Sequence, residues 1–209
     1  MAVPDDIDNI VEFCKDNFHI YETCSQALEI PFEESRGFYR EVATRCVQYP
    51  FSTLVTTANG EIVGILLNSV WNRSDYMENH GSNETGVREQ IVAMSNLIEQ
   101  CRNDFWNLAP SDISTVLHRE ISSVSNAFQR KGIANRMASE NMNLENLRKY
   151  NIGGIMSETT SYANQVLLEK HGFETLKEYL YCDILNSKGE KMLITTDGTT
   201  GTKLNFKRI

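Results

Sequence analysis

The chain contains 209 residues with a formal net charge of −8, and 41% of its residues are hydrophobic and 23% charged. This composition is typical of a globular protein with a buried core, and the length predicts a single domain over residues 1–209. The acidic balance argues against general nucleic-acid binding, which requires a basic surface. A locally basic segment in such a chain suits a small anionic ligand better.

Five cysteines are spread along the chain without a C-x-x-C pair. This spacing matches neither a zinc module nor a disulfide framework, so we expect reduced cysteines. No two histidines have metal-ligand spacing, and no metal site is predicted. The acidic start does not resemble a secretory signal, and no apolar run is long enough to span a membrane. We therefore expect a cytoplasmic protein without a membrane partner.

Hydrophobic periodicity and turn residues divide the chain into alternating helices and strands. Helices are predicted over about residues 7–18, 33–48, 87–101, 133–149 and 164–171. Strands are predicted over about residues 52–58, 61–70, 115–124, 155–159, 174–183 and 203–208, and a polar surface loop over 71–86. Asn59-Gly60 lies between the first two strands and is typical of a tight hairpin. Because helices and strands alternate without an internal repeat, we predict a layered α/β or α+β fold.

The segment Gln129-Arg130-Lys131-Gly132-Ile133-Ala134 lies between a strand and a helix. Gly132 and Ala134 carry almost no side chain, so a ligand can approach the backbone closely. Successive amides at the positive end of a helix dipole form an anion site suited to a pyrophosphate. Arg130 and Lys131 add positive charge. This loop is therefore the predicted site of a small anionic ligand.

The order of motifs after residue 115 resembles the GCN5-related N-acetyltransferase (GNAT) superfamily. A strand ending at Val124 is followed by Gln129-x-x-Gly132-x-Ala134, a strand, and a helix that ends at Gly172-Phe173. The acyl-CoA loop of that family has the form Arg/Gln-x-x-Gly-x-Gly/Ala, and its next helix commonly ends in a Gly-Phe pair. The resemblance covers residues 115–183 and implies a central mixed, mostly antiparallel, twisted sheet flanked by helices.

The resemblance also implies which residues bind acetyl-CoA as co-substrate. The pyrophosphate is expected on the loop, and the backbone amide of Val124 is expected to face the thioester oxygen. Polar side chains at the start of the next helix are expected to contact the pantetheine arm. The implied cofactor-binding residues are Val124, Gln129, Arg130, Lys131, Gly132, Ile133, Ala134, Ser161 and Asn164.

Within the superfamily, the chain looks most like the arylalkylamine (dopamine-type) N-acetyltransferases of insects and nematodes. Phe18 and Glu22 match the spacing of their N-terminal motif, and Tyr181, Asp183 and Gly189 match their last strand and turn. The implied function is acetyl-CoA-dependent transfer of an acetyl group to a primary amine of a small molecule, such as an arylalkylamine. The implied partner is that amine, and we expect a monomer or a homodimer.

Three positions depart from the family pattern. The usual first strand is missing or replaced, because Asp5 already lies at the start of the first predicted helix, and this exposes an edge. Leu168 stands where many members have a general-acid tyrosine, and Ala163 where the insect enzymes have a serine. Two alternatives therefore stay open. One is a non-catalytic acetyl-CoA-binding protein of this fold, and the other is a protein or peptide N-acetyltransferase.

Acetyl transfer to an alkyl ammonium requires a base, and a carboxylate is the natural choice. Glu22 is the first candidate, since the family motif has a catalytic glutamate there, and an exposed helix charge is the alternative. Glu120 is the second candidate, and a cross-strand ion pair is its alternative. Ser157 and Ser161 are candidate proton donors to the leaving thiolate. For Ser161, a CoA contact and a plain helix N-cap are further interpretations.

Overall fold

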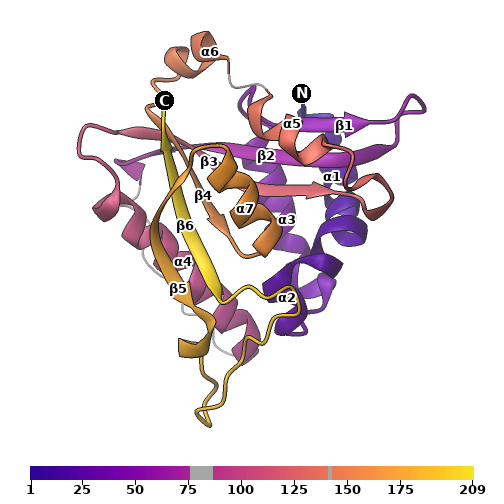
Figure 1. The fold of residues 1–209 in the computed structure, drawn as a ribbon. Helices are drawn as coiled ribbons and strands as arrows, with labels where there is room; N and C mark the ends of the chain where they lie inside the picture. Colours follow the sequence, from indigo (N-terminus) through magenta and orange to yellow (C-terminus); the bar gives the residue numbers. More distant parts are fainter. Residues whose placement is uncertain (76–86, 141–142) are drawn as a thin grey trace.

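The computed structural model describes residues 1–75, 87–140 and 143–209. Its centre is a six-stranded sheet of order β1-β2-β3-β4-β6-β5, with helices on both faces (Figure 1). All neighbouring strands are antiparallel except β3 and β4, which are parallel. The sheet is therefore mixed and mostly antiparallel, and the predicted fold class is confirmed.

The α-helices of the described residues are α1 (Ile7–Phe13), α2 (Thr23–Ala27), α3 (Phe32–Cys46), α4 (Glu89–Leu108), α5 (Ile133–Ser139), α6 (Leu144–Lys149) and α7 (Tyr162–Lys170). The strands are β1 (Thr53–Thr56), β2 (Ile62–Asn72), β3 (Thr115–Val124), β4 (Gly154–Thr159), β5 (Glu174–Leu180) and β6 (Gly201–Arg208). Short 3₁₀ turns cover Pro4–Asp6, His19–Tyr21, Asn126–Phe128 and Tyr181–Asp183, and a π-helical turn covers Cys14–Phe18.

Helices α1, α3 and α4 lie on one face of the sheet, and α5 and α7 lie on the other (Figure 1). Side chains alternate between the faces along each strand. Ile65 and Leu67 of β2 accordingly belong to the cluster that contains Val42 of α3, whereas Leu66 packs with Met137 of α5. Both faces of the sheet are therefore covered, and polar side chains between the layers are withdrawn from water.

The Asn59-Gly60 turn joins β1 and β2 as predicted. Gly60 has a φ of +84°, and the amide of Thr57 donates to the carbonyl of Glu61 over 2.9 Å. Within residues 1–75 no strand precedes α1. The amide of Ala2 instead donates to Ser52 at 3.0 Å, just before β1. Since β1 lies at the end of the strand order, it is an edge strand.

The predicted continuous helix over residues 133–149 is wrong. Helix α5 ends at Ser139, and Glu140 is extended, with a ψ of 148°. The side chain of Asn143 then accepts a hydrogen bond from the amide of Glu145 and caps α6. Asparagine in this position stabilises a helix start, and its side chain competes with backbone hydrogen bonding in a helix interior. The helical spacing of apolar residues therefore continues through two short helices, and it does not reveal the break between them.

Other boundaries shift for identifiable reasons. Helix α4 extends to Leu108, beyond the predicted end at Cys101, because Phe105 continues its buried face at i+4. The first predicted helix leaves α geometry after Phe13 and continues as the π-helical turn. The loop predicted over 71–86 is wrong at its start, where β2 runs to Asn72, and its residues 76–86 lie outside the described part of the chain.

Candidate functional site

Strands β3 and β4 are hydrogen-bonded over only three residue pairs, from Val116–Gly154 to His118–Met156. Beyond this point β3 continues to Val124 and β4 to Thr159, and the two halves of the sheet diverge (Figure 1). The facing edges of the two strands therefore carry backbone groups that do not pair with each other.

The backbone of Val124 faces this open edge. The amide of Ser125 donates to the carbonyl of Val63 over 2.9 Å, so the hydrogen-bonding groups of Ser125 point toward β2. These groups alternate along an antiparallel strand, and those of Val124 therefore point away from β2. The carbonyl of Val124 accepts from the side chain of Gln129 at 3.1 Å. Its amide lies on the same edge.

The loop after β3 adopts the shape that its sequence predicts. Arg130 and Gly132 have φ values of +61° and +81°, and Gly132 is the N-cap of α5. The left-handed conformation is natural for glycine and less favourable for arginine. The Lys131 ammonium donates to the carbonyl of Ala127 at 3.2 Å. In the described part of the chain, no side chain caps the first turn of α5, which leaves the amides of Ile133 and its successors open.

Ser161 occupies the N-cap position of α7, but its hydroxyl makes no capping hydrogen bond. Asp197 from the C-terminal loop caps this helix instead, and accepts from the amide of Tyr162 at 2.9 Å. Asp197 also accepts from the hydroxyl of Thr23 at 3.2 Å, and so joins α7 to α2. Ser161 is therefore the N-cap residue of α7 by position, but its side chain does not supply the capping hydrogen bond. Asn164 lies one turn further along α7 and is half-buried, like Ser161.

Ser157 is buried on β4, and its hydroxyl donates to the carbonyl of Arg119 at 3.1 Å. This hydrogen bond spans the two strands just after their backbone pairing stops. In the present geometry the proton of Ser157 is therefore engaged within the sheet.

Glu22 is buried and caps α2. Its two carboxylate oxygens accept from the amides of Cys24 at 3.1 Å and Ser25 at 2.6 Å, and the hydroxyl of Thr160 donates to Oε1 at 2.7 Å. The alternative of an exposed helix charge is therefore wrong. Thr160 directly follows β4, so the contact holds Glu22 at the end of the diverging strands.

Glu120 lies at a β-bulge in β3. Leu67 pairs with Ile121 and Asn68 pairs with Arg119, so Glu120 is the extra residue. Its carboxylate accepts two hydrogen bonds from the Arg45 guanidinium of α3 and one from Ser69 at 2.6 Å. Burial alone would raise the pKa of Glu120, but the charge of His118 and the Arg45 and Ser69 hydrogen bonds lower it to about 2.

The ion pair expected for Glu120 is thus present, but Arg45 comes from a helix and not from a neighbouring strand. A carboxylate with so low a pKa is a poor proton acceptor at neutral pH. The geometry therefore favours a structural role for Glu120.

A second buried pair lies beside Glu120, and the sequence motifs did not indicate it. His118 Nε2 is 2.5 Å from Oε2 of Glu158, and the His118 ring lies 4.0 Å from the ring of Trp71. The guanidinium of Arg102 of α4 also lies over the Trp71 ring, 5.1 Å from its centroid. The sequence does show a histidine in an alternating strand and a glutamate directly after Ser157. It does not show that these two strands are neighbours, so the contact between His118 and Glu158 could not be predicted.

Arg119 is buried on the opposite face of β3, with only 3% of its surface exposed. Its Nε and Nη2 atoms have no hydrogen-bond partner among the described residues. Burial lowers the pKa of the guanidinium to about 10. In the described part of the chain, no ion pair compensates this charge, and burial of Arg119 is therefore costly.

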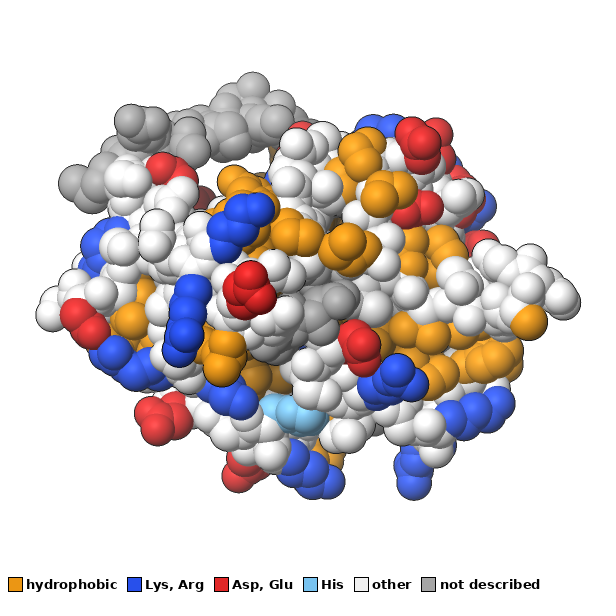
Figure 2. All heavy atoms as spheres, turned by 90° about the horizontal axis from the view of Figure 1, so that it is seen from above, with side chains coloured by type: hydrophobic (Ala, Val, Ile, Leu, Met, Phe, Trp, Pro, Cys, Tyr) orange, Lys and Arg blue, Asp and Glu red, His pale blue; other side chains and the backbone are white. Residues whose placement is uncertain are grey.

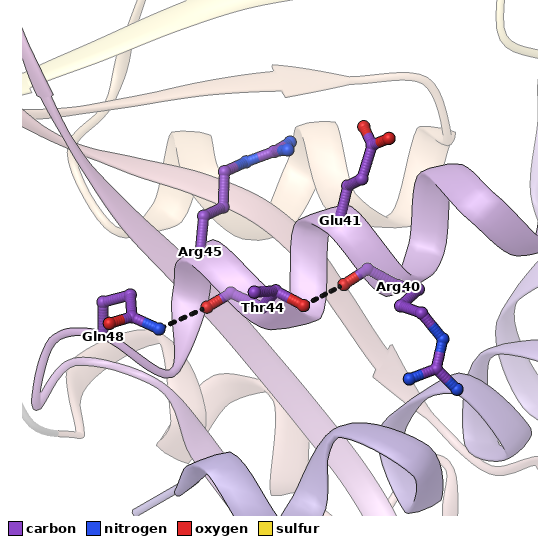
Figure 3. Close-up of a pocket in the computed structure, with 5 residues that line it drawn as sticks. All are labelled: Arg40, Glu41, Thr44, Arg45 and Gln48. Carbon is purple, nitrogen blue, oxygen red and sulfur yellow. Dashed lines mark hydrogen bonds between the residues drawn. The ribbon is translucent and has the colours of Figure 1, made fainter.

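A hollow of about 530 Å³ lies on α3 and not at the diverging strands. It is lined by one side of that helix and by the turn after it, through Arg40, Glu41, Thr44, Arg45 and Gln48 (Figure 3). Hydrogen bonds from Thr44 to Arg40 and from Gln48 to Thr44 run along the helix within it. A depression formed by a single exposed helix lacks the converging polar groups of a ligand site.

The surface seen from above carries Lys and Arg side chains among acidic and apolar ones (Figure 2). Among the described residues, no group of three or more His, Cys, Asp or Glu side chains is arranged to hold a metal ion. In the same part of the chain, no helix has both the length and the apolar character needed to cross a membrane.

No protein-family model and no curated protein matches the chain. Solved structures do match it. The arylalkylamine N-acetyltransferase 2 from Aedes aegypti has a TM-score of 0.81 at 18% identity, over 100% of this chain and 96% of that one. The Drosophila melanogaster polyamine N-acetyltransferase, which forms N-acetylagmatine, has a TM-score of 0.75 at 12% identity, over 100% and 98%.

The C-terminal condensation domain of Ebony, in complex with β-alanyl-dopamine, matches with a TM-score of 0.72 at 17% identity, over 98% of this chain and 95% of that one. At such identities the similarity establishes the fold. The chain has the GNAT fold, as the motifs after residue 115 predicted, and the fold of insect arylalkylamine N-acetyltransferases in particular.

Proposed function

We propose that this chain is an acetyl-CoA-dependent N-acetyltransferase that acts on a primary amine of a small molecule, such as an arylalkylamine. The observation that carries the proposal is the open edge of β3. Val124 presents its backbone there, and the loop that follows leads to the uncapped start of α5. An extended thioester with a pyrophosphate at its far end matches this arrangement.

The neighbours support the acceptor class. The Aedes enzyme is named for arylalkylamines and the Drosophila enzyme for polyamines, and both are N-acetyltransferases. A GNAT fold with buried carboxylates near the diverging strands is suited to an amine that arrives as a cation. The four buried free cysteines support the cytoplasmic location that we propose for the chain.

In the proposed reaction, Glu22 receives a proton from the substrate ammonium, directly or through water. The amine nitrogen then attacks the thioester carbon, and the amide of Val124 stabilises the oxyanion. The C–N bond forms, the C–S bond breaks, and the electron pair of that bond remains on sulfur. The second amine proton passes to the thiolate.

We assign the last transfer to Ser161 and not to Ser157. The Ser161 side chain makes no capping bond, whereas the Ser157 hydroxyl is already donated to Arg119. Gln129, the loop to Ala134, and Asn164 are proposed to hold the cofactor.

The test is to incubate the protein with acetyl-CoA and a panel of primary amines, and to follow the release of free thiol. Binding of CoA is measured separately by calorimetry. Turnover with one class of amine supports the proposal and identifies the acceptor. Binding of CoA without turnover with any amine indicates a non-catalytic acetyl-CoA-binding protein. Absence of both overturns the assignment of the loop.

A further inference from the structure

Three buried polar atoms lack a hydrogen-bond partner near the point where β3 and β4 separate. They are Oε1 of Glu158, Nε of Arg102 and Nδ1 of His118, which faces Oε1 of Glu120 at 3.7 Å. Unpaired buried polar atoms are destabilising, and native structures usually satisfy them. The unpaired Oε1 of Glu158 therefore indicates a place where a polar ligand completes the hydrogen bonding.

Glu158 is held rigidly by one of its oxygens. His118 contacts Oε2 at 2.5 Å, and the Trp71 ring fixes the imidazole from the side. The second oxygen, Oε1, is buried and has no donor, although 12% of the whole Glu158 side chain is exposed. One oxygen is thus held by His118 and the other is unpaired.

Glu158 has fewer charged partners than Glu120. Arg45 pairs with Glu120, and Arg102 lies 3.9 Å from Glu120. Burial would raise the pKa of Glu158, but the charge and hydrogen bond of His118 and the charge of Arg102 lower it. Glu158 therefore stays ionised, with Cys101 of α4 as a further titratable neighbour.

Glu158 also lies close in the chain to a residue that contacts the candidate base. It is two positions before Thr160, whose hydroxyl donates to Glu22 just after the end of β4. Glu22 itself already accepts three hydrogen bonds.

We propose that Glu158, held by His118, binds the ammonium group of the acceptor and makes the site selective for cationic amines over neutral analogues. This proposal rests on the proposed function, since it concerns the acceptor of the same reaction. Glu158 contacts the substrate, and His118 is a positioning residue that fixes the orientation of the carboxylate.

The test compares the binding of tyramine with that of its neutral analogue 4-(2-hydroxyethyl)phenol, by calorimetry with CoA present. Glu158→Gln is expected to weaken tyramine binding about 10- to 100-fold, because a charge-assisted hydrogen bond is lost. Binding of the alcohol should change less than about 3-fold. The matched control is Glu99→Gln, an exposed glutamate on α4, which should leave both affinities unchanged. Equal loss for amine and alcohol, or no tyramine binding by the unaltered protein, overturns the proposal.

Two further variants distinguish a loss of amine binding from a general folding defect. Glu158→Asp keeps the charge and is expected to retain most of the preference for tyramine over the alcohol. His118→Gln should raise KM for the amine with a smaller change in kcat, whereas a purely structural residue would lower the melting temperature without changing the preference. A preference unaffected by Glu158→Gln in folded protein contradicts the assignment.

The calorimetric readout also separates this proposal from the proposed function. If thiol release fails with every amine but tyramine binding depends on Glu158, then acetyl transfer is wrong and the ammonium site is right. If turnover occurs and the preference for tyramine over the alcohol does not depend on Glu158, then acetyl transfer is right and the ammonium site is wrong.

Discussion

The Thr160 hydroxyl donates to Oε1 of Glu22 over 2.7 Å, and this contact joins residues 138 positions apart in the chain. Thr160 follows β4, and Glu22 caps α2. A second link runs parallel to it, since Asp197 accepts from both Thr23 and the amide of Tyr162. The N-terminal helices are thereby fastened to the corner where β4 leads into α7, and the candidate base is held beside the diverging strands.

Replacement of Glu22 by Gln is expected to lower kcat at neutral pH about 100-fold or more, because the amide cannot accept the substrate proton. Loss of one capping acceptor should also cost about 1 kcal/mol of stability. The measurement is kcat against pH together with a melting curve. Activity should recover near pH 10, where an alkyl amine is largely neutral. A variant that loses stability but keeps its neutral-pH rate would leave Glu22 as a cap only.

Replacement of Gly132 by Val is expected to weaken CoA binding at least 10-fold. A β-branched side chain is disfavoured at a φ of +81°, and it would fill the space that a ligand needs next to the loop backbone. The matched control is Gly189→Val, at a φ of +79° in the C-terminal turn, where a Cβ also meets nothing within 4 Å. Calorimetry should show normal CoA affinity for this control, and equal losses for the two variants would contradict the loop assignment.

Replacement of Arg45 by Met is expected to destabilise the fold by about 1–3 kcal/mol at pH 7, because it leaves Glu120 buried without its main partner. The loss of stability is moderate because 34% of the Arg45 side chain is exposed and its charge is screened by solvent. Urea unfolding measures the effect. Arg40→Met, on the same helix, removes only an exposed pair with Asp8 and should cost less than about 1 kcal/mol.

The ion pair between Arg45 and Glu120 also makes the stability of the fold depend on pH in the acid range. The pKa of Glu120 is about 2 in the folded protein and 4.5 as its ordinary value. A carboxyl group with a lowered folded pKa contributes stability that is fully present above pH 4.5 and is lost as the pH falls toward 2. Arg45→Met should therefore flatten the dependence of unfolding free energy on pH between 4.5 and 2. An unchanged slope would show that the pair does not control this titration.

Replacement of Arg119 by Met is expected to leave stability unchanged or to raise the melting temperature. Burial lowers the pKa of the guanidinium to about 10, so the folded protein carries a cost for its charge below that pH. A linear apolar side chain of similar length removes this cost and keeps the packing. Thermal unfolding at pH 7 is the measurement, and a marked drop in melting temperature would indicate an anionic partner for Arg119.

Local signals predicted much of the architecture. The Asn59-Gly60 hairpin, the strand Thr115–Val124 and the loop through Gly132 all depend on nearest-neighbour conformational preferences. The wrong long helix after Gly132 has the same origin, because one apolar period continues through α5 and α6 and hides the cap at Asn143. The spacing of apolar residues indicates which face of a helix is buried, but it does not indicate where the helix ends.

The sequence by itself determined the fold class, the order of the motifs and the turn at Gly132 that opens α5, because each rests on residues close together in the chain. Only the tertiary structure decided which carboxylates are free. Glu120 is engaged by Arg45, Glu22 caps a helix, and Glu158 keeps one oxygen unpaired beside His118. The reason is physical: the protonation and availability of a buried group depend on burial and on charges that other elements bring to it, and these contacts cross the whole length of the chain.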